Sequence, residues 1–347
     1  MFYVRPIARD DLPALFALSE RTGMGLTTLP ANAERLASRI ERSLESFASR
    51  ASSAEACYVF VLVDGSINTI AGISAIEAAV GLAEPWYNYH VGTQVHASRE
   101  LKVYTAAPTL FLTNDHTGHS ELCSLFVDAR YRRGKNGPLI AKSRLLFVAE
   151  FADRFAAKLI AELRGKLDAE GRSPFWEGLG KHFFAMEYSR ADYLTGIGRK
   201  AFIAELMPRH PVYTALLPAD ARAAIGEVHS DTAPARSMLE AEGFRYEGYV
   251  DIFDAGPTVE CFRDNILAVR QSQILAVTLG EEDPVPDSVT DEVLWLVSNR
   301  RFDSFRAVLC PAPARVAQFP LLPHAAEALG VGEGDTVRAV PLSPRDR

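Results

Sequence analysis

Residues 121–138 read Glu121-Leu122-Cys123-Ser124-Leu125-Phe126-Val127, then Asp128-Ala129-Arg130-Tyr131-Arg132-Arg133-Gly134-Lys135-Asn136-Gly137-Pro138. The first seven residues predict a strand. After the loop, one face of a long helix is predicted by Ile140, Phe147, Phe151 and Phe155. Pro138 suits the first position of that helix, where its missing N–H is not needed. The order is strand, basic loop with glycines, helix, which indicates an α/β protein.

The loop is suited to bind a pyrophosphate. A loop that leaves a strand and opens a helix directs several backbone N–H groups and the positive end of the helix dipole at one point. Arg132, Arg133 and Lys135 add positive charge. The spacing is neither that of a Walker loop nor G-x-G-x-x-G. We take Arg133, Gly134 and Gly137 as candidate binding residues, with a solvated basic turn as the alternative.

The elements before this unit are a strand, two helices and a hairpin. They are predicted at residues 2–7 (strand), 12–19 and 32–47 (helices), and 58–63 and 70–80 (strands). The hairpin turn is marked by Asp64-Gly65. Residues 86–96 add a further extended segment. The fold class is therefore α/β (α+β), a mixed central sheet flanked by helices.

The second half of the chain contains an insertion and an appendage. Residues 156–224 predict a mostly helical insertion, 224–229 a strand, and 234–242 a helix closed by Gly243. Short strands and turns follow from residue 265. We therefore expect one domain over residues 1–264 and a small β-rich region over 265–347.

Composition excludes several classes of protein. The 44 acidic and 37 basic side chains leave a net charge of −7, which disfavours a nucleic-acid partner. No uncharged apolar run reaches the ~18 residues of a membrane span. The N-terminus has no signal-peptide pattern, so the chain is expected to be soluble and cytoplasmic.

The sequence offers no clear metal site. The four cysteines form no C-x-x-C pair and are expected to be reduced and buried. Asp115, His116 and His119 are three candidate ligands within one short loop, which we interpret as a polar turn. Glu121 and Cys123 share a strand face. Glu121 could be a base or the partner of a cation, and Cys123 could be a nucleophile, although packing is the favoured interpretation of Cys123.

His229 is the candidate for proton transfer. It ends the predicted strand at 224–229 and precedes Ser230-Asp231-Thr232 and a helix. An imidazole exchanges protons near neutral pH. Asp231 is close enough in sequence to orient the ring, while a structural histidine is the alternative.

In chain order these elements resemble the GNAT acyltransferase superfamily. The superfamily pattern V-x-x-x-N-x-x-A appears as Val228, Thr232 and Ala235, with Thr in place of Asn. The pattern A-x-x-x-Y-x-x-x-G-F appears at residues 235–244, with Leu239 in place of Tyr. That tyrosine commonly protonates the leaving thiolate, and leucine cannot. The R-x-x-G-x-G/A loop appears at residues 133–138 with Asn and Pro where glycines are usual.

A narrower resemblance, to the arginine N-succinyltransferase family with its arginine/ornithine forms, explains both departures. Five strings carry it: Gly25-Leu26-Thr27-Thr28-Leu29-Pro30, Ser120-Glu121-Leu122-Cys123-Ser124-Leu125-Phe126, Ser173-Pro174-Phe175-Trp176, Phe202-Ile203-Ala204-Glu205-Leu206-Met207-Pro208 and Val228-His229-Ser230-Asp231-Thr232-Ala233-Pro234-Ala235. The resemblance implies a transfer of the succinyl group from succinyl-CoA to the α-amino group of arginine, in arginine catabolism. It also implies that His229 is the catalytic proton donor and that Leu125 contacts succinyl-CoA.

Other functions and partners stay open at this point. Ornithine could be a second acceptor beside arginine. The alternatives are a non-catalytic or weakly active subunit that binds CoA esters, and a GNAT enzyme for another amine. A homo-oligomer and a pairing with a paralogous subunit are both compatible with the sequence. For the substrate, Glu121 and Glu205 are candidate partners of the guanidinium, and Arg21 and Arg99 of the succinyl carboxylate.

Overall fold

The computed structural model describes residues 1–21, 29–197, 201–280 and 292–343, and its backbone is a long, mixed sheet flanked by helices. The first half contains β1 (Phe2–Pro6), α1 (Leu12–Ser19), α2 (Ala33–Phe47), β2 (Cys57–Asp64), β3 (Thr69–Glu77), β4 (Asn88–Ser98), β5 (Val103–Thr113), β6 (Ser120–Val127), α3 (Asn136–Glu150) and β7 (Lys158–Glu162). The second half contains α4 (Lys181–Phe184), α5 (Tyr188–Gly196), α6 (Ala201–Leu206), β8 (Val212–Tyr213), α7 (Ala219–Ala224), α8 (Ala233–Ala241), β9 (Arg245–Val250), β10 (Pro257–Phe262), α9 (Leu267–Gln271), β11 (Gln273–Leu279), β12 (Glu292–Ser298), β13 (Ala307–Pro313), β14 (Phe319–Leu321), α10 (Pro323–Leu329) and β15 (Thr336–Pro341).

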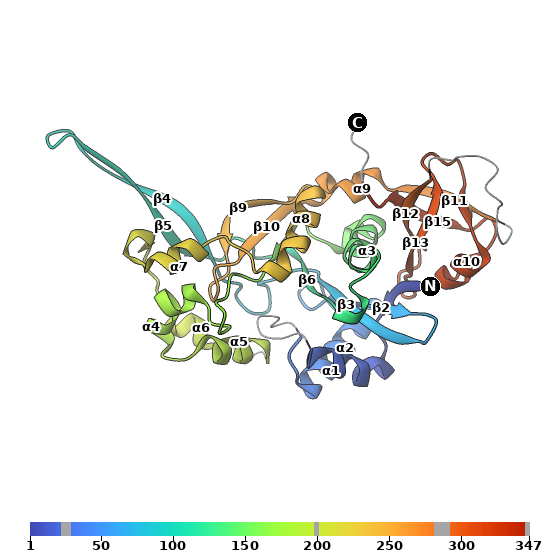
Figure 1. Cartoon of the computed structure of the whole chain (residues 1–347), viewed down its shortest axis with the longest axis horizontal. Helices are drawn as coiled ribbons and strands as arrows, with labels where there is room; N and C mark the ends of the chain where they lie inside the picture. Colours follow the sequence, from blue (N-terminus) through green and yellow to red (C-terminus); the bar gives the residue numbers. More distant parts are fainter. Residues whose placement is uncertain (22–28, 198–200, 281–291, 344–347) are drawn as a thin grey trace.

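Within the described residues the strands follow the order β14-β11-β15-β12-β13-β1-β2-β3-β6-β7-β10-β9-β4-β5-β8. Neighbours are antiparallel except for the pairs β6–β7 and β11–β14. The long hairpin β4–β5 projects from one end of the molecule, and β11–β15 form the other end (Figure 1). The predicted fold class, a mixed sheet flanked by helices, is confirmed.

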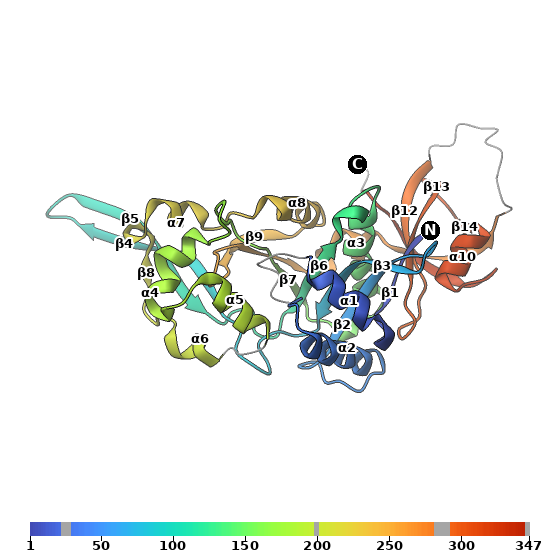
Figure 2. The same cartoon turned by 60° about the horizontal axis from the view of Figure 1, so that its bottom comes forward.

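Two hydrophobic cores lie on opposite faces of β1–β3 and β6 because side chains along a strand alternate. On β2, Tyr58 and Phe60 pack with Phe147 of α3, whereas Val59 and Val61 pack with α1 and α2. Figure 2 shows α3 and the α1–α2 pair on the two sides of these strands. The central sheet is thus buried on both faces, as its near-continuous apolar strands require.

Most predicted elements are present with small changes at their ends. Helix α2 begins as predicted behind Asn32, whose side chain accepts a hydrogen bond from the N–H of Arg35. Helix α3 begins at Asn136, so Pro138 is its third residue and not its first. It also ends at Glu150, so the prediction of Phe155 on this helix was wrong. The ring of Phe155 nevertheless packs 5.9 Å from that of Phe147, because the chain turns back at the helix end.

The predicted strand at residues 224–229 was wrong. Ala224 ends α7, and Gly226 adopts a φ of +76°, which breaks an extended chain. Only an isolated bridge between Val228 and Gly165 remains. Within residues 156–224, the structure places β7 in the central sheet and the helices α4 to α7 beside the β4–β5 hairpin (Figure 2). Strand β5 was not predicted.

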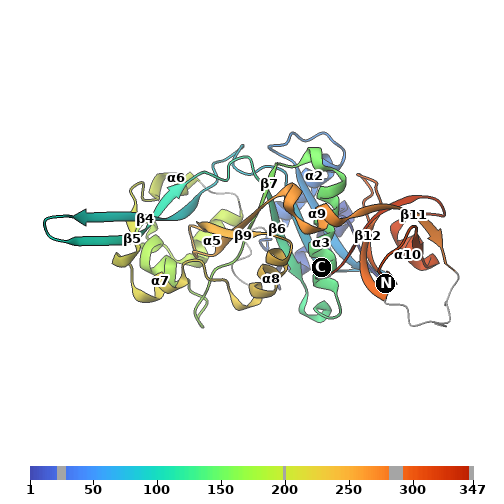
Figure 3. The same ribbon diagram turned by 90° about the horizontal axis from the view of Figure 1, so that it is seen from above.

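The C-terminal strands join the central sheet through β13, which pairs with β1. Phe302 and Phe305 of the β12–β13 connection pack on Phe147. Seen from above, α3 lies between α8 and the C-terminal strands (Figure 3). No helix in the described ranges is long and apolar enough to cross a membrane. The division into residues 1–264 and 265–347 remains our proposal.

A buried ion pair ties α3 to the rest of the chain. Lys142 Nζ lies 2.7 Å from Glu242 Oε1 and donates to the carbonyl of Leu342, also at 2.7 Å. We expect Lys142→Met to lower the free energy of unfolding by about 3–5 kcal/mol, because it leaves a buried carboxylate without its cation. Urea unfolding measures this. Arg9→Met, which breaks the exposed pair with Glu41, is the control and should change stability little; equal losses in both variants would contradict the prediction.

Candidate active site

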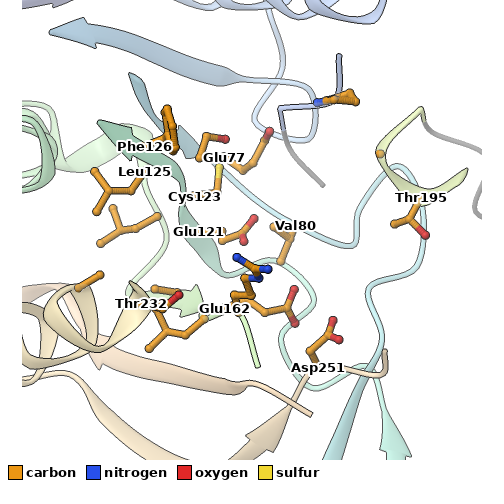
Figure 4. A pocket seen from close by; sticks show the side chains of 18 of the residues that line it. Glu77, Val80, Glu121, Cys123, Leu125, Phe126, Glu162, Thr195, Thr232 and Asp251 are labelled. Carbon is orange, nitrogen blue, oxygen red and sulfur yellow. The ribbon is translucent and has the colours of Figure 1, made fainter. Parts of the chain in front are cut away.

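A cavity of about 1050 Å³ opens beside β6. Its walls come from α2, β6, the loop before α3, β7, α5, residues 230–239 and residues 251–254. Figure 4 shows Glu121, Cys123 and Leu125 along β6, with the side chains of Glu162 and Thr232 beside this strand. The cavity thus lies where the predicted donor loop, the central strand and the segment after His229 meet.

Strand β6 carries a bulge at the cavity wall. In its pairing with β3, Ile73 faces Phe126 and Ala75 faces Cys123, so one residue of β3 opposes two residues of β6. Ser124, at the bulge, adopts a φ of +55°. Such a bulge turns backbone groups out of the ladder, so the strand can offer an N–H near Leu125 to a ligand.

Strands β6 and β7 separate next to this bulge. Their parallel pairing covers only Ser120 with Leu159 and Glu121 with Ile160. Beyond that point the two strands share no paired residues in the described sheet, and both Leu125 and Glu162 line the cavity. A ligand can therefore enter between two strands that are adjacent in the sheet.

Arginines support the bulge. The buried Arg144 of α3 donates to the carbonyls of Ala75 and Cys123 at 3.2 and 3.1 Å, and burial lowers its pKa to about 10. Arg39 of α2 donates to Ser124 Oγ at 2.6 Å. The bulge is therefore held from both faces of the sheet.

The loop before α3 forms the basic side of the cavity. Gly134 has a φ of +59°, and a methyl group added at Gly134 or Gly137 would meet no atom within 4 Å. The open space above these glycines lets a ligand approach the backbone closely. Arg133, Gly134 and Gly137 line the cavity, whereas Lys135 does not, and their binding of a donor stays a prediction.

The opposite wall is acidic, and sequence reasoning missed it. Glu162 ends β7, and Asp251 and Asp254 lie in the turn between β9 and β10. Burial raises the pKa of all three carboxyls, and the neighbouring carboxylate of Asp251 raises that of Glu162 further. The cavity therefore has one basic and one acidic end, which suits a substrate pair of opposite charges.

His229 lies at the edge of this site. It is not among the lining residues, but the residues that follow it, Ser230, Asp231 and Thr232, are. Its backbone N–H donates to the carbonyl of Arg164 at 2.9 Å, and its Nδ1 accepts from the N–H of Asp231 at 3.2 Å. The Asp231 carboxylate is 4.0 Å away. Nε2 therefore carries the ring proton in the neutral form.

Its surroundings favour neutral His229. Burial lowers the pKa of the imidazole, the charge of Arg164 lowers it further, and Asp231 and Asp254 oppose this in part. The side chain is 22% exposed, so solvent still reaches it. Leu239 of α8 lines the cavity, so this helix presents no hydroxyl at that position.

Other candidates from the sequence have structural roles. His116 is 1% exposed and lies between Asn88 and Glu260, at 2.8 and 3.1 Å. Cys123 is buried, which raises the pKa of its thiol. In the described part of the chain no group of three or more His, Cys, Asp or Glu side chains could hold a metal ion.

Three of the four candidate substrate partners lie away from the cavity wall. Arg21 is paired with Asp128 at 2.6 Å, and Arg99 and Glu205 are exposed. Glu121 lines the cavity and is 5% exposed. Residues 25–28 of the first family string lie outside the described residues, so the structure does not place them.

The bulged strand β6 separates here from its parallel neighbour, and a glycine-containing basic loop at a helix N-terminus lies beside it. This arrangement is typical of an acyltransferase that holds a phosphate-bearing acyl donor. Comparison with known proteins agrees. Residues 2–268 match the family described as the arginine N-succinyltransferase beta subunit, and residues 277–341 match its C-terminal domain.

Relatives cover the whole chain. An arginine N-succinyltransferase from Yersinia pseudotuberculosis is 52% identical over 99% of this chain and 98% of its own length. One from Enterobacter sp. is 52% identical over 100% and 99%. The solved structure of arginine/ornithine succinyltransferase subunit AI from Pseudomonas aeruginosa matches with a TM-score of 0.89 and 36% identity, over 99% of both chains. The chain belongs to the arginine N-succinyltransferase family.

Proposed function

We propose that this protein transfers the succinyl group of succinyl-CoA to the α-amino group of L-arginine. The product is N2-succinylarginine, and free CoA leaves. The observation that supports this most is the single cavity that joins the β6 bulge, a basic loop and an acidic wall, in a chain whose relatives carry the name of this activity. The donor and the amine would occupy its basic and acidic ends.

The donor fits the basic end. The pyrophosphate of CoA would accept hydrogen bonds from backbone N–H groups at Gly134 and Gly137 and from Arg133. The pantetheine arm would then run between β6 and β7 and carry the thioester to Leu125. A backbone N–H at the bulge would stabilise the negative oxygen of the tetrahedral intermediate.

The reaction must move two protons. The α-ammonium group of arginine has three hydrogens and the amide product keeps one. One proton therefore goes to the CoA sulfur and one to solvent. Neutral His229 would accept a proton from the attacking amine, directly or through water, and the imidazolium that results would donate a proton to the departing sulfur. The absence of a hydroxyl at Leu239 gives this role to the imidazole.

A thiol-release assay tests the function. Purified protein, succinyl-CoA and arginine should release free CoA at a rate that depends on arginine, and mass spectrometry should detect succinylarginine. Ornithine serves as a second acceptor, since the P. aeruginosa relative is named for both amines. Activity only after a second, paralogous chain is added would favour the subunit alternative, and no release with either amine would refute the proposal.

His229→Ala should lower kcat by about 10²–10⁴-fold, because it removes the proton-transfer group. Binding of succinyl-CoA, measured by calorimetry, should stay within about twofold. In the unmodified enzyme kcat should fall as the pH drops through a value below about 6.5, since protonation of His229 removes its active neutral form. That fall should be missing from the residual activity of His229→Ala. An unchanged kcat in the variant would exclude His229 from the chemistry.

Arg133→Ala should weaken binding of succinyl-CoA by about two- to fivefold at low salt, as expected for one exposed charge contact. The difference should shrink at high salt because exposed charges are screened. Lys135→Ala is the matched control on the same loop, since its side chain does not line the cavity. A larger loss with Lys135→Ala than with Arg133→Ala would place the donor elsewhere.

A further inference from the structure

The acidic wall contains carboxylates without a cation, of which Asp254 is buried and Glu162 and Asp251 are half-buried. Glu162, Asp251 and Asp254 form no ion pair within 4.0 Å with any side chain in the described ranges. Arg164 is near enough to lower the pKa of Asp254 but does not pair with it. Buried charges of one sign are costly unless a partner of the other sign reaches them. The wall is therefore complete only when a cation is bound.

Each of the two carboxylates nearest the open space has one oxygen already held by the protein. Glu162 Oε1 accepts from Asn88 Nδ2 at 2.9 Å, and Asp251 Oδ1 accepts from the N–H groups of Phe253 and Asp254 at 2.6 and 2.8 Å. The other oxygen of each carboxylate, Glu162 Oε2 or Asp251 Oδ2, accepts no hydrogen bond from an N–H group in the described part of the chain. Both side chains point into the cavity, with Asp251 on the far side from Leu125 (Figure 4).

A tyrosine supplies a further, independent sign of a ligand at this wall. Tyr188 of α5 lines the cavity and is only 4% exposed. Its hydroxyl has no hydrogen-bond partner among the described residues and is open to the cavity. Burial raises the pKa of the Tyr188 hydroxyl, and the nearby carboxylates of Asp254, Asp192 and Asp251 raise it further. The unpartnered hydroxyl thus lies beside the unpaired carboxylates.

Asn88 fixes the position of Glu162. Its Oδ1 accepts from Trp86 Nε1, a donor only, at 2.9 Å, and faces His116 Nδ1 at 2.8 Å. The amide nitrogen must therefore point toward Glu162. His116 is in turn held by Glu260, which also pairs with Lys158 at 2.7 Å. Asn88 is 1% exposed, so this orientation cannot relax into solvent.

We propose that Glu162, Asp251 and Tyr188 bind the guanidinium group of the amine substrate, and that Asn88 is the positioning residue for Glu162. A guanidinium has five N–H donors in a planar fork, which matches two carboxylate oxygens and a hydroxyl. This inference rests on the proposed function, since it takes arginine as the substrate.

The attacking α-amino group does not fit this wall. Carboxylates stabilise the charged form of a bound amine and raise its pKa. An α-amino group held there would stay protonated and could not attack the thioester. The wall therefore suits the charged group that does not react, while the α-amino group lies closer to the bulge of β6.

Citrulline separates charge from shape, because a neutral urea replaces the guanidinium in a side chain of the same length. The unmodified enzyme should prefer arginine. Glu162→Gln and Asp251→Asn should each lower kcat/KM for arginine by about tenfold or more, as expected for the loss of a hydrogen bond to a charged group. They should change kcat/KM for citrulline and KM for succinyl-CoA by less than about twofold. Tyr188→Phe should lower kcat/KM for arginine by about threefold.

Asn88→Leu should raise KM for arginine by about tenfold while kcat stays within about twofold. Thr258→Val is its matched control, because Thr258 Oγ1 is another side-chain contact of the same amide, at 3.3 Å, and leaves the bond to Glu162 intact. A general structural effect would change KM for succinyl-CoA and the melting temperature in both variants. Equal KM values for arginine in Asn88→Leu and Thr258→Val would overturn the role of Asn88.

The outcomes separate this inference from the proposed function. If the two acidic variants keep the arginine-to-citrulline ratio of the unmodified enzyme while thiol release continues, the guanidinium site is wrong and the function stands. If one variant fails to fold, the other and Tyr188→Phe decide. If the unmodified enzyme releases no thiol with arginine, the function is refuted and this inference with it.

Discussion

The guanidinium of Arg144 is the interaction on which the site depends. It is 3% exposed, yet it bonds two carbonyls on adjacent strands, Ala75 of β3 and Cys123 of β6, next to the bulge. Arg144 belongs to α3, whose N-terminus carries the basic loop. One buried side chain therefore couples the place where a thioester carbonyl would be polarised to the place where a pyrophosphate would be held. Removal of a buried cation from water is costly, and the lowered pKa of Arg144 reflects that cost.

The same geometry separates charge within the cavity. Two of the arginines that line the cavity, Arg132 and Arg133, are exposed on a loop, where solvent screens them and a flexible phosphate chain can adjust to them. The negative groups Glu162, at the end of β7, and Asp251, in the turn after β9, are half-buried and are held by hydrogen bonds from the protein. A fixed network discriminates between substrates better than an exposed loop, because a wrong ligand leaves buried polar groups unpaired. We therefore expect the acidic end of the cavity to discriminate between ligands and the basic end to tolerate differences between them.

Much of this fold was predictable from local pattern, but the acidic wall was not. Strands β1, β2, β3 and β6 and helices α1 to α3 follow from apolar periodicity, and the loop at residues 132–138 from its position between a strand and a helix. Glu162 and Asp251 are 89 positions apart and belong to no motif. They meet only because β10 pairs with both β7 and β9. A charged residue that ends an apolar strand, as Glu162 does after Leu159-Ile160-Ala161, was the available signal.

His229 shows that a residue can be a useful functional candidate even when its secondary structure is predicted wrongly. Its context was predicted as a strand, whereas the chain there is a turn after Gly226 that touches the sheet through the carbonyl of Arg164. In this turn the Nδ1 of His229 accepts a hydrogen bond from the N–H of Asp231, which holds the ring in one orientation. A histidine kept neutral by burial can accept the amine proton and then donate it to the sulfur as an imidazolium, where a tyrosine would donate its own hydroxyl proton. Leu239 and His229 are therefore best interpreted together. In this proposal the proton for the departing sulfur comes from the turn before α8 and not from α8 itself.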